Sequence, residues 1–144
     1  MKIVISESQY KRLIEAKEEQ KVLRIPSLKF FNDDWFILEK FLDHKGNPPY
    51  SISGDLGLGG KPVKSLGNLQ SVGGSLDLEG TPIESLGNLQ SVGGYLDLTG
   101  TQIKSLRNLQ SVGGYLSLLN TPLSKMYNEK QIREMVNVGG RIHL

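Results

Sequence analysis

The sequence has no cysteine and only two histidines among its 144 residues. Without cysteine, disulfides and thiolate metal sites are excluded, and two histidines leave very little for a zinc site. The formal charge of +2, from 17 basic and 15 acidic residues, does not suggest a nucleic-acid binder. No apolar run approaches the ~18 residues of a membrane span, and the N-terminus has no signal-peptide apolar region. We therefore expect a cytoplasmic protein with neither a nucleic-acid nor a membrane partner.

Glycine is abundant by contrast, with 17 residues of 144 against a usual share of about 7%. These glycines recur within a twenty-residue repeat that covers residues 61–80, 81–100 and 101–120. The first pair of repeats shares 15 of 20 positions and the second pair 14 of 20. Partial repeats precede them at residues 52–58 and follow at residues 138–144. Leucines at fixed offsets in such a period are typical of a solenoid, in which stacked repeats bury a common core.

Each repeat contains six aliphatic residues that one repeat alone cannot bury. In the first repeat they are Val63, Leu66, Leu69, Val72, Leu76 and Leu78. The alternation around Asp77 predicts a strand, and stacking such strands gives a parallel sheet. Paired glycines, such as Gly73 and Gly74, precede each strand, and we expect them to allow a tight corner with positive φ. Asn68 and its equivalents form a second column that can satisfy backbone groups at a corner.

Leu96-Asp97-Leu98, followed by Thr101 and Ile103, resembles the leucine-rich repeat family in its short bacterial and viral form of about twenty residues. Thr101 stands where that family usually has asparagine. The Val-Gly-Gly-x-Leu-x-Leu run also resembles the repeats of receptor L domains, and the match covers about residues 50–144. Separately, residues 3–10 resemble short N-termini of many tailed-phage proteins. If a phage encodes the chain, the expected location is the host cytoplasm.

We therefore predict an α+β, mostly β fold, a leucine-rich-repeat-like solenoid with a parallel sheet and helical caps. Residues 50–144 form the solenoid and residues 1–49 an N-terminal helical cap region. Capping-box residues Ser6 and Gln9 predict a helix over 7–18, and an apolar stripe predicts another from Asp34 to about His44, covering the first repeat. Capping-box spacing also predicts a C-terminal cap helix at about 128–136, before a last strand over 141–144.

If the leucines of the predicted strands point inward, the residues between and beside them point outward. We call this surface the outward face, and its candidate partner-binding residues are Asp55, Ser75, Asp77, Glu79, Tyr95, Asp97, Thr99, Tyr115, Ser117, Leu119, Arg141 and His143. Its early repeats are acidic, and its late repeats carry tyrosine, arginine and histidine. Tyrosine and arginine often anchor interfaces. We expect a non-catalytic, monomeric protein-binding module whose partner has a basic patch beside a groove that accepts aromatic side chains.

Several alternatives stay open at this point. The chain could assemble with copies of itself or within a particle, or the outward face could bind carbohydrate through Tyr95, Tyr115 and Asp97, or bind nothing. The glycine-rich residues 54–61 depart from a phosphate-binding loop, because Asp55 and Pro62 stand at required glycine and serine or threonine positions. Adjacent aspartates could act as an acid–base pair or hold calcium, but nothing beyond proximity supports this. We predict no enzyme, no catalytic residue, no metal and no cofactor.

Overall fold

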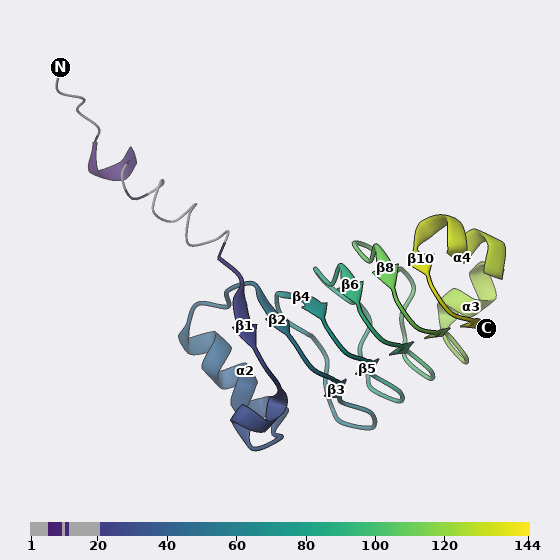
Figure 1. Ribbon diagram of the computed structural model, residues 1–144, viewed down its shortest axis with the longest axis horizontal. Helices are drawn as coiled ribbons and strands as arrows, with labels where there is room; N and C mark the ends of the chain where they lie inside the picture. Colours follow the sequence, from purple (N-terminus) through teal and green to yellow (C-terminus); the bar gives the residue numbers. More distant parts are fainter. Residues whose placement is uncertain (1–5, 10, 12–20) are drawn as a thin grey trace.

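The computed structural model describes residues 6–9, 11 and 21–144, in which short parallel strands form two sheets and helices are few (Figure 1). The six-stranded sheet has the order β1-β2-β4-β6-β8-β10, and the five-stranded sheet the order β11-β9-β7-β5-β3. Successive repeats therefore lie side by side, each giving one strand to each sheet. This α/β arrangement of parallel strands is compatible with a repeat protein.

The strands of the six-stranded sheet are β1 (Leu23–Ile25), β2 (Tyr50–Ile52), β4 (Leu69–Val72), β6 (Ser91–Val92), β8 (Ser111–Val112) and β10 (Asn137–Val138). Those of the five-stranded sheet are β3 (Leu56–Gly57), β5 (Leu76–Asp77), β7 (Leu96–Asp97), β9 (Leu116–Ser117) and β11 (Ile142–His143). The helical segments are the 3-10 helix η1 (Leu28–Phe31) and the helices α2 (Trp35–His44), α3 (Pro122–Met126) and α4 (Glu129–Met135).

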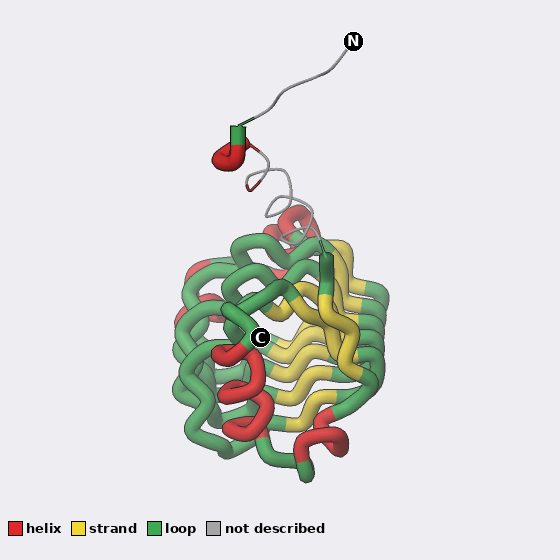
Figure 2. Tube along the Cα trace, turned by 90° about the vertical axis from the view of Figure 1, so that its left-hand side faces the viewer, coloured by secondary structure: helices red, strands yellow, loops and turns green. Residues whose placement is uncertain are grey.

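The register of both sheets follows the twenty-residue period. Leu76 pairs with Leu96 in one sheet, and Ser71 pairs with Ser91 in the other. Viewed along the stack, the strands of successive repeats lie one behind another (Figure 2). All six aliphatic positions of each repeat are buried, as predicted. Stacking thus gives one continuous core from residues that a single repeat would leave exposed.

The sequence interpretation was wrong about the number of sheets. It expected one parallel sheet, built from the Leu-x-Leu strands, and assigned no second sheet to the residues before each glycine pair. The Ser-Val pairs of β6 and β8 instead form ladders of their own. A strand of two residues shows no alternation, so its pattern cannot be recognised in the sequence.

The reason for the paired glycines also differs from the prediction, since none of them has a positive φ. The positive φ values belong to other glycines, such as Gly80 and Gly100. At the pairs it is the backbone of the preceding repeat that excludes a side chain, because a Cβ on Gly93 would overlap the carbonyl oxygen of Gly73. This close approach allows the amide of Gly94 to donate to the carbonyl of Gly74 at 2.9 Å.

Two polar columns run along the stack. Buried threonines at positions 81, 101 and 121 each donate their hydroxyl to the leucine carbonyl three residues earlier, at 2.7 to 2.8 Å. Asn88 donates to the side chain of Asn68 at 3.0 Å, and Asn68 donates to the backbone carbonyl of Asn47 at 2.6 Å. The expected asparagine column is therefore confirmed. The threonines satisfy backbone carbonyls at a second corner, to which the sequence interpretation assigned no residues.

Helix α2 begins after Asp34, whose carboxylate accepts from the amide of Phe36 at 2.9 Å. Its residues Trp35, Leu38 and Leu42 are buried in the common core, as the apolar stripe predicted. Strand β1, which the sequence interpretation missed, pairs with β2 at this end of the six-stranded sheet. The region before residue 50 thus contributes a strand as well as a helix.

The first predicted helix lies mostly outside the described residues. The capping box is confirmed, since Ser6 N–H donates to Gln9 Oε1 at 2.8 Å and Gln9 N–H donates to Ser6 Oγ at 3.2 Å. Residues 7–9 and 11 are helical. Residues 10 and 12–20, which contain the expected apolar side chains of this helix, are not described.

At the other end, helix α4 confirms the helix predicted at 128–136, with a complete capping box at Asn128 and Gln131. Helix α3, which the sequence interpretation missed, begins after Thr121 with a proline in its first turn. The last strand is confirmed as β11. The segment between the third repeat and the last partial repeat therefore holds two short helices.

Candidate functional site

The candidate site is the outward face of the five-stranded sheet. The register aligns Gly57, Asp77, Asp97, Ser117 and His143 across five neighbouring strands. The leucines paired beside them, such as Leu76 and Leu96, are fully buried. Alternation therefore places the intervening side chains on the other side of the sheet, as the sequence interpretation expected.

Two tyrosines dominate the late part of this face. The rings of Tyr95 and Tyr115 stack with centroids 4.8 Å apart and planes only 2° from parallel. His143 meets Tyr115 edge-on, with ring centroids 5.5 Å apart at 79°. Tyr95 and Tyr115 occupy the same position of successive repeats, whereas His143 lies on β11 opposite Ser117, two residues beyond the equivalent Arg141. The three residues, far apart in the sequence, thus form one aromatic row. Both tyrosines are half-buried, so part of each ring stays accessible.

The residues before this row tie the repeats together. Asp55 Oδ1 accepts from the amide of Ser75 at 2.7 Å, and Ser75 Oγ accepts from the amide of Tyr95 at 3.0 Å. Each bond crosses from one repeat to the next. These two bonds therefore hold the backbone at Ser75 and Tyr95 against the preceding repeat, and the Asp55 and Ser75 side chains that accept them are small.

Three carboxylates lie beside the aromatic row. One ligand oxygen from each of Asp77, Glu79 and Asp97 lies within 4.8 Å of the other two. Asp77 Oδ1 accepts from the amide of Glu79 at 2.9 Å, and Asp97 Oδ1 accepts from the amide of Thr99 at 3.0 Å. Among the described residues, the one ion pair joins Arg133 to Glu129 on another part of the surface. The negative charge of this acidic group has no cationic partner within the described chain.

The carboxylates act on the neighbouring phenols. Burial, followed by the charges of Asp77, Asp55 and Asp97, raises the pKa of Tyr95 above its ordinary value. Burial also raises the pKa of Tyr115, with Asp97 as the next largest cause. Both phenols therefore keep their protons at neutral pH and remain hydrogen-bond donors. The nearby carboxylates contribute to both shifts in the same direction as burial.

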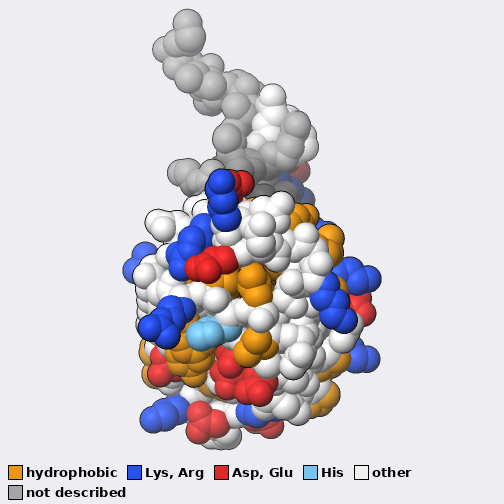
Figure 3. Space-filling model, turned by 90° about the vertical axis from the view of Figure 1, so that its right-hand side faces the viewer, with side chains coloured by type: hydrophobic (Ala, Val, Ile, Leu, Met, Phe, Trp, Pro, Cys, Tyr) orange, Lys and Arg blue, Asp and Glu red, His pale blue; other side chains and the backbone are white. Residues whose placement is uncertain are grey.

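Four predicted residues contribute less directly to this arrangement. Ser117 bonds Thr99 hydroxyl to hydroxyl at 2.7 Å and is only 4% exposed, so almost none of it is available to a partner. Leu119 and Arg141 are exposed, and the guanidinium of Arg141 makes no ion pair within the described residues. Viewed from the C-terminal end, charged side chains of both signs border apolar ones (Figure 3).

The sequence interpretation overlooked a second surface, on the six-stranded sheet. We call it the serine face, and its central residues are Ser71, Ser91, Ser111 and Asn137. Together with the adjoining glycines they line a shallow groove of about 390 Å³. The repeated Gln-Ser-Val-Gly-Gly run is the signal that could have revealed it. This surface is uncharged and changes little from one repeat to the next.

Comparison of the chain with known protein families, with curated proteins and with solved structures finds no match. Within the described residues, no helix combines the length and the apolar character needed to cross a membrane. The site must therefore be interpreted from its own geometry.

Proposed function

We propose that the chain is a non-catalytic protein-binding module, a capped solenoid of the leucine-rich-repeat type that binds a partner through the outward face. The observation that carries this proposal is the stacked pair Tyr95 and Tyr115 beside the acidic group formed by Asp77, Glu79 and Asp97. The pair supplies a rigid anchor, and the acidic group supplies the charge that selects a partner.

The aromatic row is closed at one end and accessible at the other. Tyr115 lies between Tyr95 and His143, whereas Tyr95 has Tyr115 as its single ring partner among the described residues. On its other side Tyr95 follows Ser75, a small side chain. A lysine or arginine of the partner placed over this side of the ring gains a cation–π contact.

Carboxylates also surround this position. Burial raises the pKa of Tyr95 most, and the charges of Asp77, Asp55 and Asp97 raise it further. Asp55, Asp77 and Asp97 each have Oδ1 occupied by a backbone amide. Their Oδ2 atoms remain to accept from a guanidinium or ammonium group. We therefore expect a basic segment of a protein, with a groove for the tyrosine edges, as the partner.

The test is capture of the partner from lysate by the tagged chain, with wild type compared with the Tyr95→Ala/Tyr115→Ala variant. Phe30→Ala is the matched control, because Phe30 is an aromatic residue 72% exposed outside the outward face. Light scattering and circular dichroism first establish that all three proteins are folded and monomeric. A protein retained by wild type and by Phe30→Ala, but lost in the double variant, supports the proposal.

Equal capture by all three proteins would contradict it. Charge is tested separately with Asp77→Asn/Asp97→Asn, for which we expect weaker capture and a smaller dependence on salt. Retention of glycans without any protein partner would indicate carbohydrate binding instead. Concentration-dependent oligomers of the wild type would indicate assembly.

A further inference from the structure

Two columns of backbone hydrogen bonds run along the glycine pairs of the stack. In the first column, the amides of Gly93, Gly113 and Gly139 donate to the carbonyls of Val72, Val92 and Val112, at 2.8 to 2.9 Å. In the second column, the amides of Gly94, Gly114 and Gly140 donate to the carbonyls of Gly74, Gly94 and Gly114, at 2.8 to 3.0 Å. Each repeat thus offers two carbonyl acceptors to the glycine pair of the next repeat.

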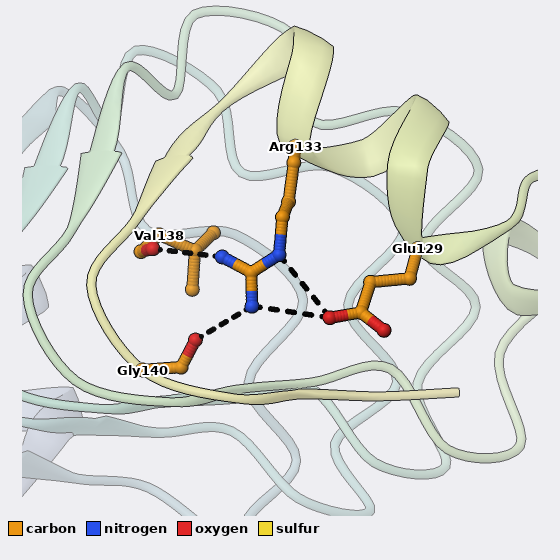
Figure 4. A network of polar contacts seen from close by, with 4 residues as sticks. All are labelled: Glu129, Arg133, Val138 and Gly140. Atoms are coloured by element: carbon orange, nitrogen blue, oxygen red, sulfur yellow. Dashed lines mark hydrogen bonds and ion pairs between the residues drawn. The ribbon is translucent and has the colours of Figure 1, made fainter.

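The last repeat offers the same two acceptors, but no further glycine pair follows it. By position they are the carbonyls of Val138 and Gly140. Arg133 occupies both, with Nη1 donating to Val138 at 3.0 Å and Nη2 donating to Gly140 at 2.9 Å (Figure 4). One planar guanidinium therefore makes the two bonds that the amides of a further glycine pair would make.

Glu129 holds this guanidinium in place from the same helix. Its Oε1 lies 3.1 Å from both Nε and Nη2 of Arg133 (Figure 4). The side chain of Arg133 is 40% exposed and that of Glu129 is 56% exposed, so the ion pair itself contributes little to stability. Its effect is orientational, because it fixes the plane in which the guanidinium presents its donors to the two carbonyls.

We propose that Arg133 is a positioning residue that ends the stack by taking the place of a further glycine pair, and so fixes the last strand of the outward face. Gly140 leads directly into Arg141 and strand β11, and His143 on that strand meets the ring of Tyr115. Anchoring Gly140 thereby holds the end of the aromatic row. The importance of this for partner binding rests on the proposed function, whereas the anchoring does not.

An arginine is required for this role, because both acceptors must be reached at once by donors in one plane. Lysine carries the same charge but is a point donor without the fork, so it can satisfy only one carbonyl well. Helix α4 supplies the geometry, since its capping box fixes where the helix begins and its residue Ile132 is fully buried in the core. Arg133 follows that buried residue directly.

The experiment is amide hydrogen exchange by NMR on the full chain, comparing wild type with Arg133→Met. We expect the amides of Gly139 and Gly140 to exchange about tenfold faster or more in the variant, while those of Gly93 and Gly94 change less than about twofold. We also expect the side-chain protons of His143 to lose the ring-current shift caused by Tyr115. Arg133→Lys should give an intermediate exchange rate.

Lys130→Met is the matched control, since it removes an exposed cation of α4 that makes no hydrogen bond or ion pair within the described residues. Unchanged exchange at Gly139 and Gly140 in Arg133→Met, or an equal effect of Lys130→Met, overturns the proposal. Equal acceleration in every repeat also overturns it, because Arg133 would then act on the whole stack. If Arg133→Met does not fold, Arg133→Lys decides by the same local criterion. No partner is present, so failure here leaves the binding proposal standing.

Discussion

The outward face and the serine face belong to the same repeats but differ in how much they vary. The serine face has serine at positions 71, 91 and 111, whereas the equivalent positions of the outward face change from Ser75 to Tyr95 and from Asp97 to Ser117. The same two-sheet architecture supports both surfaces. Folding therefore does not require the variation on the outward face, and the proposed binding role gives a reason for it.

The glycine pairs between the two faces are uniform for a physical reason. At these pairs the backbones of neighbouring repeats come too close for a side chain. The outward face has no such restriction at Gly57, where an added Cβ meets nothing within 4 Å. Backbone packing thus excludes a side chain at the glycine pairs, whereas Gly57 on the outward face has room for one.

The largest expected effect comes from testing this constraint directly. Gly93→Ala places a Cβ against the carbonyl of Gly73, and we expect it to lower the free energy of unfolding by about 3 kcal/mol or more. Gly57→Ala should change it by less than ~0.5 kcal/mol. Urea denaturation of both variants checks this. Similar values for the two substitutions would remove the proposed difference between the glycine pairs and the outward face.

A second test compares a tyrosine of the core with one of the outward face. Tyr50 is fully buried and donates to the carbonyl of Leu66 at 2.6 Å. Tyr50→Phe removes this bond, and we expect a loss of about 1–2 kcal/mol at neutral pH. Tyr115→Phe, whose ring is half-buried, should lose less than ~0.5 kcal/mol. Equal losses would show that both tyrosines serve the fold alike.

The pH dependence of Tyr50 sharpens the same comparison. Burial, with a smaller effect of Glu39, raises the pKa of Tyr50 in the folded state. The unfolded chain therefore loses the proton first, and stability falls as the pH rises above about 10 toward the folded-state pKa. The Tyr50→Phe variant has no phenol proton at this position. Its deficit in unfolding free energy relative to wild type should therefore shrink above about pH 10. A constant deficit in urea titrations would contradict this.

The smallest expected effect lies at a corner outside both faces. Arg107 has a φ of 45°, whereas the equivalent Gly67 and Gly87 have 61° and 58°. Residues other than glycine are strained in this left-handed region of positive φ. We expect Arg107→Gly to raise the free energy of unfolding by about 0.5–1 kcal/mol, as measured in urea. A decrease would show that the arginine side chain makes a stabilising contact worth more than the strain.

The period of the sequence was sufficient to predict the Leu-x-Leu strands, their register and the columns of the outward face. These follow because every repeat must bury the same aliphatic positions. Helices α2 and α4 were also predictable, since Asp34 and Asn128 are local capping signals that need no tertiary information. The identities of the face residues could be assigned, but the 2° stacking of the tyrosines depends on side-chain packing in three dimensions.

Other features could not be predicted for identifiable reasons. A repeated glycine pair is equally consistent with positive φ and with close backbone approach, and only the structure shows that Gly93 faces the carbonyl of Gly73. The role of Arg133 depends on where α4 places its side chain relative to β10 and the corner after it. Nothing in the local sequence connects an arginine on a helix with carbonyls that lie beyond the helix end.

The measurement that tests the central claim most directly is the affinity of the captured partner for two variants. Tyr95→Ala/Tyr115→Ala changes the outward face, and Ser71→Asn/Ser91→Asn changes the serine face using the residue already present in that column at Asn137. We predict that the first lowers the affinity about 100-fold or more, because it removes two anchor residues, and that the second changes it by less than about threefold. The reverse result would place the partner on the serine face and contradict the account.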